Sequence, residues 1–379
     1  MSTRFLHTSD WQLGVTRHFL DADAQARWAE ARFEAIRRLG RIALETRCEF
    51  IVVAGDVFES SQVDRRTVGR ACEAMAGISL PIYLLPGNHD VLDAGSVYAS
   101  RPWRERRPAH VQVLDRFGEA LEVRPGVEVA GAPWTSKRPL TDLVADAGAR
   151  LAPAPGVLRV LVGHGIVDTL SPDRDNPAVI SVAGAEAAMA AGRYHYLALG
   201  DRHSLTAVGA SGRIHYSGTH EAYDFGEVDP GKVLVVELSA EGVKVTPHQT
   251  GTWRFMTHEA RLSSSDDVEA LARHLGALAD KERTLVKLGL VGTLGLAAHA
   301  RLEAVQDEAR DLFAALVQSG SRSDLAVLPE GTDFEGLSLA GFAAKALDTL
   351  RAQAAGGGAA GDAAADALAL MVRLAGRAP

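Results

Sequence analysis

The feature that most constrains this chain is the segment 49–58, EFIVVAGDVF, a run of β-branched and aromatic residues that ends in Gly55-Asp56 and continues to Phe58. Such a run is typical of a buried strand. In a parallel sheet, functional side chains gather where the strands end at the carboxyl edge. The pattern therefore places Asp56 at that edge, on a rigid support, although an isolated Gly-Asp pair more often closes a turn.

Four further strand-like runs also end in polar side chains of the types that bind metals. These runs are residues 4–10, 81–90, 158–164 and 194–203. Helical spacing of apolar residues lies between the early runs, at residues 23–45 and about 64–76. The alternation of strand, ligand-rich loop and helix predicts an α/β layered fold.

The candidate ligands at these five strand ends are carboxylates, amides and imidazoles, which suit a pair of divalent cations such as Mn, Fe or Zn. They are Asp10, Gln12, Asp56, Asn88, His89, His164, Asp201 and His203. Each alone has a structural explanation, because Asp10 could cap a helix, Asn88 could fill a turn and a single strand-end histidine is usually structural. Their recurrence at one predicted edge favours a shared metal site.

The segments around these residues resemble the five ordered motifs of calcineurin-like metallophosphoesterases. The matching segments are HTSDWQLG (7–14), GDVFE (55–59), GNHD (87–90), GH (163–164) and GDRH (200–203). Within that superfamily the chain resembles the SbcD-type nuclease subunits of an ATPase-coupled DNA repair complex, a resemblance that extends to the later run 216–227. The motif-level similarity covers roughly residues 4–250.

The resemblance implies an α/β (α+β) fold in which a two-sheet β-sandwich is flanked by helices. It assigns residues 1–250 to the metallophosphoesterase (nuclease) domain, 251–332 to a small α+β capping domain and 333–379 to a C-terminal helical tail. The sequence itself agrees, because 379 residues are more than one ordinary domain contains and the pattern of predicted elements changes at Thr252. After that point strands and helices alternate, with a longer helix predicted over 296–317.

By position, the resemblance implies that Asp56 bridges two metal ions. The other ligands divide between the ions, with Asp10, Gln12 and His203 on the first and Asn88, His164 and Asp201 on the second. His89 would not bind metal but would protonate the leaving oxygen or stabilise the transition state, with Asp90 orienting its imidazole. Two ions would hold the phosphate and activate water.

Two positions depart from the family pattern, which usually has histidine where this chain has Gln12 and Asp201. A glutamine carbonyl is a weaker ligand than imidazole for transition metals, whereas the aspartate adds negative charge. We therefore expect two divalent ions, Mn²⁺ in preference to Mg²⁺, Fe²⁺ or Zn²⁺, with the first ion bound more loosely. A degenerate site without turnover is the alternative.

A net charge of −8 argues against a nucleic-acid coat over the whole surface but leaves room for a local basic patch. The segment 101–108, RPWRERRP, is expected to be a loop bounded by prolines. Its arginines and tryptophan suit phosphate contact and base stacking, although a solvated charged surface explains them equally well. The candidate DNA-binding residues are Arg101, Trp103, Arg104, Arg106 and Arg107.

The sequence thus predicts a metal-dependent phosphodiesterase that acts on DNA as an exonuclease or endonuclease. The resemblance implies a homodimer and a partner ATPase with a long coiled coil, of the SbcC type. Either of the helical runs at 339–350 and 363–374 could be the docking surface, and folding back on the capping domain explains these runs equally well. The competing interpretations are a phosphodiesterase or phosphomonoesterase of small molecules, and a catalytically silent scaffold.

The compartment is predicted from three features of the sequence. No uncharged apolar run of ~20 residues is present, and the N-terminus lacks a signal-peptide pattern. Cys48 and Cys72 are expected to be buried free thiols rather than a disulfide. These features predict a cytoplasmic protein that makes no membrane contact.

Overall fold

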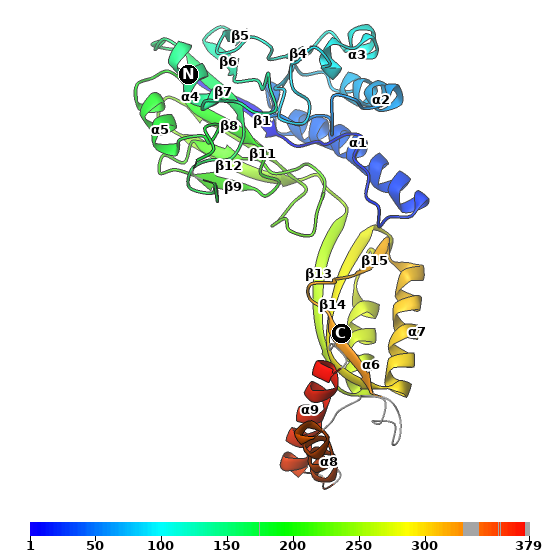
Figure 1. The fold of residues 1–379 in the computed structure, drawn as a ribbon. Coiled ribbons are helices and arrows are strands. Elements are labelled where there is room, and N and C mark those ends of the chain that lie inside the picture. Colours follow the sequence, from blue (N-terminus) through cyan, green and yellow to red (C-terminus); the bar gives the residue numbers. More distant parts are fainter. Residues whose placement is uncertain (174, 329–340, 355, 357, 376–379) are drawn as a thin grey trace. The chain divides into compact units, whose positions relative to one another are not determined.

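The structure is a computed structural model that describes residues 1–173, 175–328, 341–354, 356 and 358–375. It divides into two compact units (Figure 1). The first comprises residues 1–18 and 25–253, and the second residues 19–24 and 254–379. Each unit is built around its own sheets and core.

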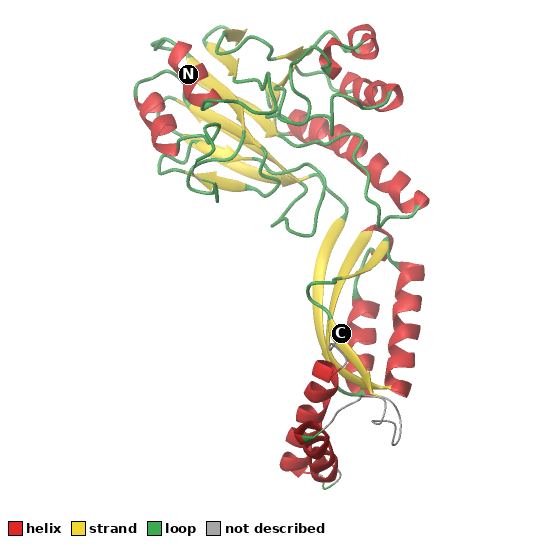
Figure 2. Cartoon of the chain, viewed as in Figure 1, coloured by secondary structure: helices red, strands yellow, loops and turns green. Residues whose placement is uncertain are grey.

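Two six-stranded sheets form the first unit (Figure 2). The first sheet contains β1 (Ser2–Thr8), β2 (Phe50–Val53), β3 (Ile82–Leu84), β4 (Val111–Val113), β11 (Lys232–Ser239) and β12 (Val243–Gln249), in the order β12-β11-β1-β2-β3-β4. The second contains β5 (Ala120–Arg124), β6 (Val127–Gly131), β7 (Leu158–His164), β8 (Tyr196–Gly200), β9 (Thr206–Val208) and β10 (Ile214–Tyr216), in the order β5-β6-β7-β8-β10-β9. Strands β1, β2 and β3 are parallel neighbours, and so are β7 and β8.

The two sheets pack face to face, and helices cover their outer faces. Alternate residues of β2 point to opposite sides, so that Phe50 and Val52 enter the core between the sheets while Ile51 and Val53 meet the helices. Helices α1 (Ala22–Glu45), α2 (Arg65–Ala76) and α3 (Arg101–Arg106) contribute to the core on the first sheet, and α4 (Leu143–Arg150) and α5 (Val182–Ala190) to that on the second. The predicted two-sheet sandwich flanked by helices is confirmed.

Several local predictions also hold for the first unit. Helices α1 and α2 occupy the ranges that the apolar spacing indicates, and Asp64 caps α2 by accepting a hydrogen bond from the backbone of Thr67. Both cysteines are free and buried.

The prediction of a loop over residues 101–108 is wrong, because Ser100 caps a helix there and Pro102 sits in its first turn.

The second unit is built on a parallel four-stranded sheet. Its strands are β13 (Arg254–Leu262), β14 (Thr284–Gly295), β15 (Ala315–Gln318) and β16 (Asp324–Leu328). The long strand β14 pairs with β13 on one side, and on the other with β15 along its first half and β16 along its second. Helices α6 (Ser265–Ala277) and α7 (Leu296–Leu312) complete the core. The helix predicted over 296–317 therefore ends early, because residues 315–318 are needed as a strand.

Two helices near the C-terminus belong to the second unit. These are α8 (Phe342–Ala354) and α9 (Gly358–Ala375), which pack on each other, and α9 also contacts β14 and β16. Leu347 and Leu368 are buried, whereas the side chain of Phe342 is 88% exposed. Residues 333–340 of the predicted tail lie outside the described residues. Among the helices that the structure describes, none is long and apolar enough to cross a membrane.

Candidate metal centre

The predicted ligands lie where parallel strands of both sheets end. Asp10, Asp56 and Asn88 follow β1, β2 and β3, while His164 closes β7 and Asp201 follows β8. Because the two sheets are packed face to face, these carboxyl ends meet. Asp10, Asp56 and His164, all buried, each offer a ligand atom within 4.8 Å of the others.

The loops after β1 and β2 are tied together by backbone hydrogen bonds. The amide of Asp10 donates to the carbonyl of Gly55 at 3.0 Å, and the amide of Gln12 donates to the carbonyl of Asp56 at 2.9 Å. Asp10, Gln12 and Asp56 have φ angles of 53°, 47° and 54°, and Asp201 has 95°. Positive φ is uncommon outside glycine and concentrates at functional sites, because the surrounding contacts must hold the strained backbone.

Two glycines in these motifs make room for neighbouring site residues. A β-carbon at Gly87 would overlap the carboxylate of Asp56, and one at Gly200 would overlap the carbonyl oxygen of Ala54. Neither position allows a larger side chain without displacing the loop beside it. The glycine that precedes a ligand in these motifs thus permits the strand ends to approach closely.

His164 is oriented toward the ligands predicted for the second ion. Its Nδ1 lies 2.8 Å from the carbonyl oxygen of Ala54, so this nitrogen carries a proton, because a carbonyl can only accept. Its Nε2 lies 3.0 Å from Oδ1 of Asn88, 3.4 Å from Oδ2 of Asp56 and 3.8 Å from Oδ1 of Asp201. The structure therefore brings together the four residues predicted to hold the second ion.

The residues predicted for the first ion are grouped around Asp10. Nε2 of His203 lies 4.0 Å from Oδ1 of Asp10. The amide nitrogen of Gln12 donates to Oδ2 of Asp56 at 3.0 Å, while the amide oxygen of Gln12 is buried and has no hydrogen-bond partner among the described residues. A buried acceptor without a partner is costly in isolation and suits a cation as its missing neighbour. The donor set thus fits a divalent ion on this side as well.

The electrostatics of the site also fit cations. Burial raises the pKa of Asp10 to about 6, and burial likewise raises the pKa of Asp201. Burial opposes ionisation of Asp56 as well, but His164 and His89 hold its pKa below the usual value. Burial alone would lower the pKa of His164, but the nearby carboxylates, Asp56 foremost, raise it well above its usual value. The buried carboxylates thus favour positive charge on the nearby imidazole of His164. Bound divalent ions would supply that positive charge instead.

His89 lies at the edge of this cluster with its side chain 38% exposed. Its Nδ1 lies 2.8 Å from the carbonyl oxygen of Glu59, and its Nε2 lies 3.9 Å from Oδ2 of Asp56. The partner that orients the imidazole is therefore Glu59, which corrects the orienting role predicted for Asp90. Nε2 of His89 remains directed toward the site.

Asp90 instead ties together the two loops on which Asp56 and His89 stand. Its buried carboxylate accepts hydrogen bonds from the backbone amides of Gly87 at 2.8 Å and Phe58 at 3.2 Å, and from the hydroxyl of Tyr98 at 2.6 Å. Burial, with a contribution from Asp56, raises the pKa of Asp90 to about 6. Asp90 is thus a structural support for the metal centre.

Comparison with known proteins agrees with this geometry. The protein family described as "Calcineurin-like phosphoesterase" matches residues 3–208, more than half of the chain. The chain belongs to the calcineurin-like phosphoesterase family. Its fold and its buried carboxylate–imidazole cluster are those of a metal-dependent phosphoesterase.

More specific similarity covers short stretches of the chain. The chain is 32% identical over 91 residues to the DNA double-strand break repair protein Mre11 of Methanococcus maripaludis, covering 23% of each protein. It is 30% identical over 90 residues to the Mre11 protein of Archaeoglobus fulgidus, covering 23% of this chain and 19% of that protein. The matches therefore span about a quarter or less of these relatives.

The crystal structure of TT1561 of Thermus thermophilus is 12% identical with a TM-score of 0.42, covering 66% of this chain and all of that one.

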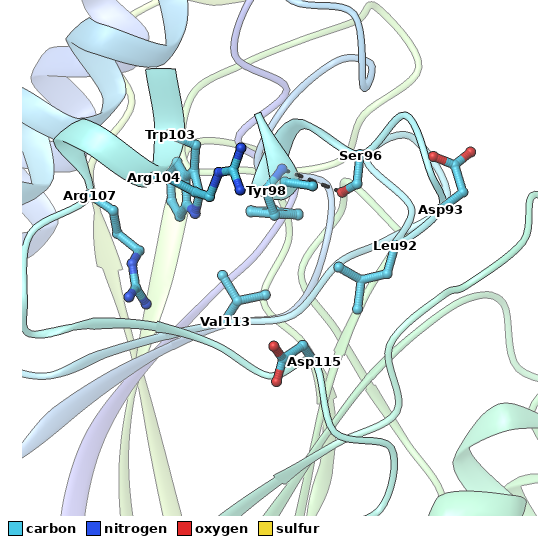
Figure 3. Close-up of a pocket in the computed structure, with 10 residues that line it drawn as sticks. Leu92, Asp93, Ser96, Tyr98, Trp103, Arg104, Arg107, Val113 and Asp115 are labelled. Carbon is cyan, nitrogen blue, oxygen red and sulfur yellow. Dashed lines mark hydrogen bonds between the residues drawn. The ribbon is translucent and has the colours of Figure 1, made fainter. Parts of the chain in front are cut away.

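The basic segment of this phosphoesterase lies on α3 rather than in a loop. Trp103 is only 2% exposed and packs edge-to-face on Tyr98 and Phe58, with ring centroids 5.2 and 6.0 Å away. The prediction that Trp103 stacks on bases is therefore wrong, because the helix turns its ring into the core. Arg104 and Arg107 line a pocket of about 380 Å³ together with carboxylates and apolar groups (Figure 3).

Two tryptophans near the metal centre are also packed in the interior. Trp11 is fully buried, and Trp134 is 9% exposed and donates from its indole to the carbonyl of His164 at 2.7 Å. Arg101 forms an ion pair with Glu105 on the surface of α3. Arg106 is exposed on the same helix.

Sequence reasoning missed two side chains that support the phosphoesterase site. Tyr98 holds the carboxylate of Asp90, and Glu227 holds the imidazole of His203 at 3.0 Å. Glu227 lies in the run 216–227, so its position in a segment that resembles SbcD-type subunits was a signal. Nothing in the sequence around Tyr98 distinguishes it from an ordinary core tyrosine.

Proposed function

We propose that this chain hydrolyses phosphodiester bonds in DNA with two divalent ions, as the nuclease subunit of an ATPase-coupled repair complex. The observation that carries the proposal is the convergence of Asp10, Asp56 and His164 beside the partly exposed imidazole of His89. Membership in the phosphoesterase family supports the reaction class. The two Mre11 proteins are repair proteins by name, and their short matches support DNA as the substrate.

The metal ligands divide as the motif positions imply. Bound divalent cations would supply Lewis-acid charge to the phosphoryl group and activate water. Asp56 lies between the two groups of ligands, since its Oδ2 is near both Gln12 and His164. The excess of oxygen donors, with Gln12 and Asp201 in place of imidazoles, favours Mn²⁺.

His89 would act on the leaving group. Its Nδ1–H donates to the carbonyl of Glu59, which fixes the ring with Nε2 facing the centre beside Asp56. As an imidazolium it would donate the proton on Nε2 to the leaving oxygen or stabilise the charge that develops in the transition state. Asp90 would contribute indirectly by holding the loops that carry Asp56 and His89.

The DNA backbone would be held by arginines rather than by an aromatic platform. Arg101, Arg104, Arg106 and Arg107 are exposed on or next to α3, whereas Trp103 is buried beneath them. Guanidinium groups suit phosphate oxygens, and contacts to phosphate carry no sequence information directly. Binding would therefore follow the shape and charge of DNA.

The ATPase partner would dock on the C-terminal helices. Phe342 on α8 is 88% exposed and Leu370 on α9 is 48% exposed, which leaves apolar side chains available on both helices. A homodimer and a cytoplasmic location complete the proposal.

Cleavage of labelled DNA tests the proposal. A hairpin and a linear duplex are incubated with the full chain and Mn²⁺, alongside the variants His89→Ala and Asp56→Ala. Cleavage by the wild type that both substitutions abolish is the expected result. The assignment of DNA as the substrate would be overturned if the wild type binds two ions but cleaves neither DNA, even when the coiled-coil ATPase is added.

The alternatives predict different results in parallel assays. An esterase for small molecules would hydrolyse a small phosphodiester or phosphomonoester and would show no salt-sensitive binding of DNA. A silent scaffold would bind DNA but would hold at most one ion and cleave neither kind of ester.

A further inference from the structure

The two imidazoles of the metal centre differ in what holds their second nitrogen. Nδ1 of His164 is paired with the neutral carbonyl of Ala54. Nδ1 of His203 is paired with the carboxylate of Glu227 at 3.0 Å. A carboxylate partner makes an imidazole a stronger donor to a metal than a neutral partner does, and it fixes the tautomer that directs Nε2 to the metal.

Glu227 is held in place at both carboxylate oxygens. Its Oε1 pairs with His203, and its Oε2 accepts the backbone amide of Tyr223 at 2.8 Å. The side chain is only 5% exposed. The ring of Tyr223 packs edge-to-face on His203, with centroids 4.6 Å apart. The imidazole of His203 is therefore fixed by the segment 223–227 through one hydrogen bond and one ring contact.

The same segment is fastened to the loop after β1. The guanidinium of Arg17 lies over the ring of Tyr223 at 3.9 Å and donates to its carbonyl at 3.0 Å. Just before this segment, the hydroxyl of Thr219 donates to the carbonyl of Asp10 at 2.9 Å. The support for His203 is thus tied to the loop that supplies Asp10 and Gln12.

We infer that Glu227 is a positioning residue that offsets the weak ligand Gln12 at the first metal position. Gln12 contributes only a neutral amide there. Glu227 adds a buried negative charge that acts on the ion indirectly, through its hydrogen bond to His203. At the second position, Nδ1 of His164 is paired instead with the neutral backbone carbonyl of Ala54. The inference rests on the metal site of the proposed function and assigns the first position an affinity that its direct ligands alone would not give.

Titration of metal-free protein with Mn²⁺, in the absence of DNA, tests this role. Free Mn²⁺ is measured by electron paramagnetic resonance for the wild type, Glu227→Gln and Glu227→Asp. Glu122→Gln, an exposed site on β5, is the control for an equal change in charge. We expect two ions on the wild type and the control, and weakening of one ion by roughly 10–100-fold in Glu227→Gln. Glu227→Asp, which keeps the charge, should recover part of the loss.

A second comparison separates positioning from a general structural role. In a His203→Ala background, Glu227→Gln should cause no further loss of Mn²⁺, because its effect passes through the imidazole. A further loss, equal weakening of both ions, or an isotherm of Glu227→Gln that matches the wild type would overturn the inference. So would a wild type that binds fewer than two ions. Failure to cleave DNA with two bound ions would count against the proposed function alone, since no DNA is present in this titration.

Discussion

The amide nitrogen of Gln12 donates a hydrogen bond to Oδ2 of Asp56 at 3.0 Å, while its amide oxygen is buried without a partner among the described residues. The residue that stands where the family usually has histidine is therefore already in contact with the carboxylate expected to bridge the ions. We predict that Gln12→His tightens binding of the first ion by on the order of tenfold, about 1.4 kcal/mol. The preference should also move from Mn²⁺ toward Zn²⁺.

Histidine is a suitable substitute here because the backbone φ of 47° is one that histidine adopts more readily than β-branched residues do. Isothermal titration with Mn²⁺ and Zn²⁺ measures the effect, with Gln12→Leu as the variant that removes the ligand. Equal affinities of Gln12→His, Gln12→Leu and the wild type would show that position 12 does not face an ion.

The glycine of the third motif gives a second prediction. A β-carbon at Gly87 would overlap the carboxylate of Asp56, so Gly87→Ala should displace that side chain and lower the free energy of unfolding by about 1–3 kcal/mol. Mn²⁺ binding should fall with it. Gly242→Ala is the matched control, since no atom lies within 4 Å of a β-carbon there. Thermal unfolding and Mn²⁺ titration of both variants check this, and wild-type metal binding by Gly87→Ala would contradict it.

Trp103 and Arg104 should respond to substitution in opposite ways. Trp103 is buried against Tyr98 and Phe58, so Trp103→Ala should lower the free energy of unfolding by about 3–5 kcal/mol. Arg104→Ala should leave stability within about 0.5 kcal/mol of the wild type but weaken DNA binding and reduce its salt dependence. Urea unfolding and fluorescence anisotropy with a labelled duplex separate the two effects. Unchanged binding by Arg104→Ala would remove α3 from the proposed DNA surface.

The candidate ligands could be identified from sequence because each one lies at the end of a buried strand or within five residues after it. Once β1, β2 and β3 are parallel neighbours, and β7 and β8 likewise, their carboxyl ends fall at the same edges. Short motifs thus determine the residues of the site and its place in the fold. They do not determine the supporting contacts, because Glu227 lies 24 residues from His203 and the pairing depends on how two loops fold together.

The error in the secondary structure of the first unit concerns a short helix. Helix α3 covers six residues, too few for an apolar period to appear, and its arginines and proline favour a loop on composition alone. The burial of Trp103 follows from the helical turn after Ser100, which sequence periodicity cannot show at this length.

The buried histidine at position 7 predicts how stability depends on pH. Burial, with a contribution from His215, lowers the pKa of His7 to about 3. An unfolded chain takes up this proton near pH 6.5, so between about pH 6.5 and 3 the unfolded state binds more protons than the folded state. Stability should therefore fall as the pH falls through that window, by about 1.4 kcal/mol per pH unit from this group, and the effect should level off below about pH 3.

Comparison of His7→Gln with the wild type isolates that contribution. Nε2 of His7 lies 3.2 Å from the carbonyl oxygen of Leu199, a contact that a glutamine amide can retain by donating to it. Urea unfolding of metal-free protein at a series of pH values should give a shallower decline for His7→Gln than for the wild type. Parallel curves for His7→Gln and the wild type would mean that His7 takes up its proton at the same pH in both states, which full burial between the sheets should prevent.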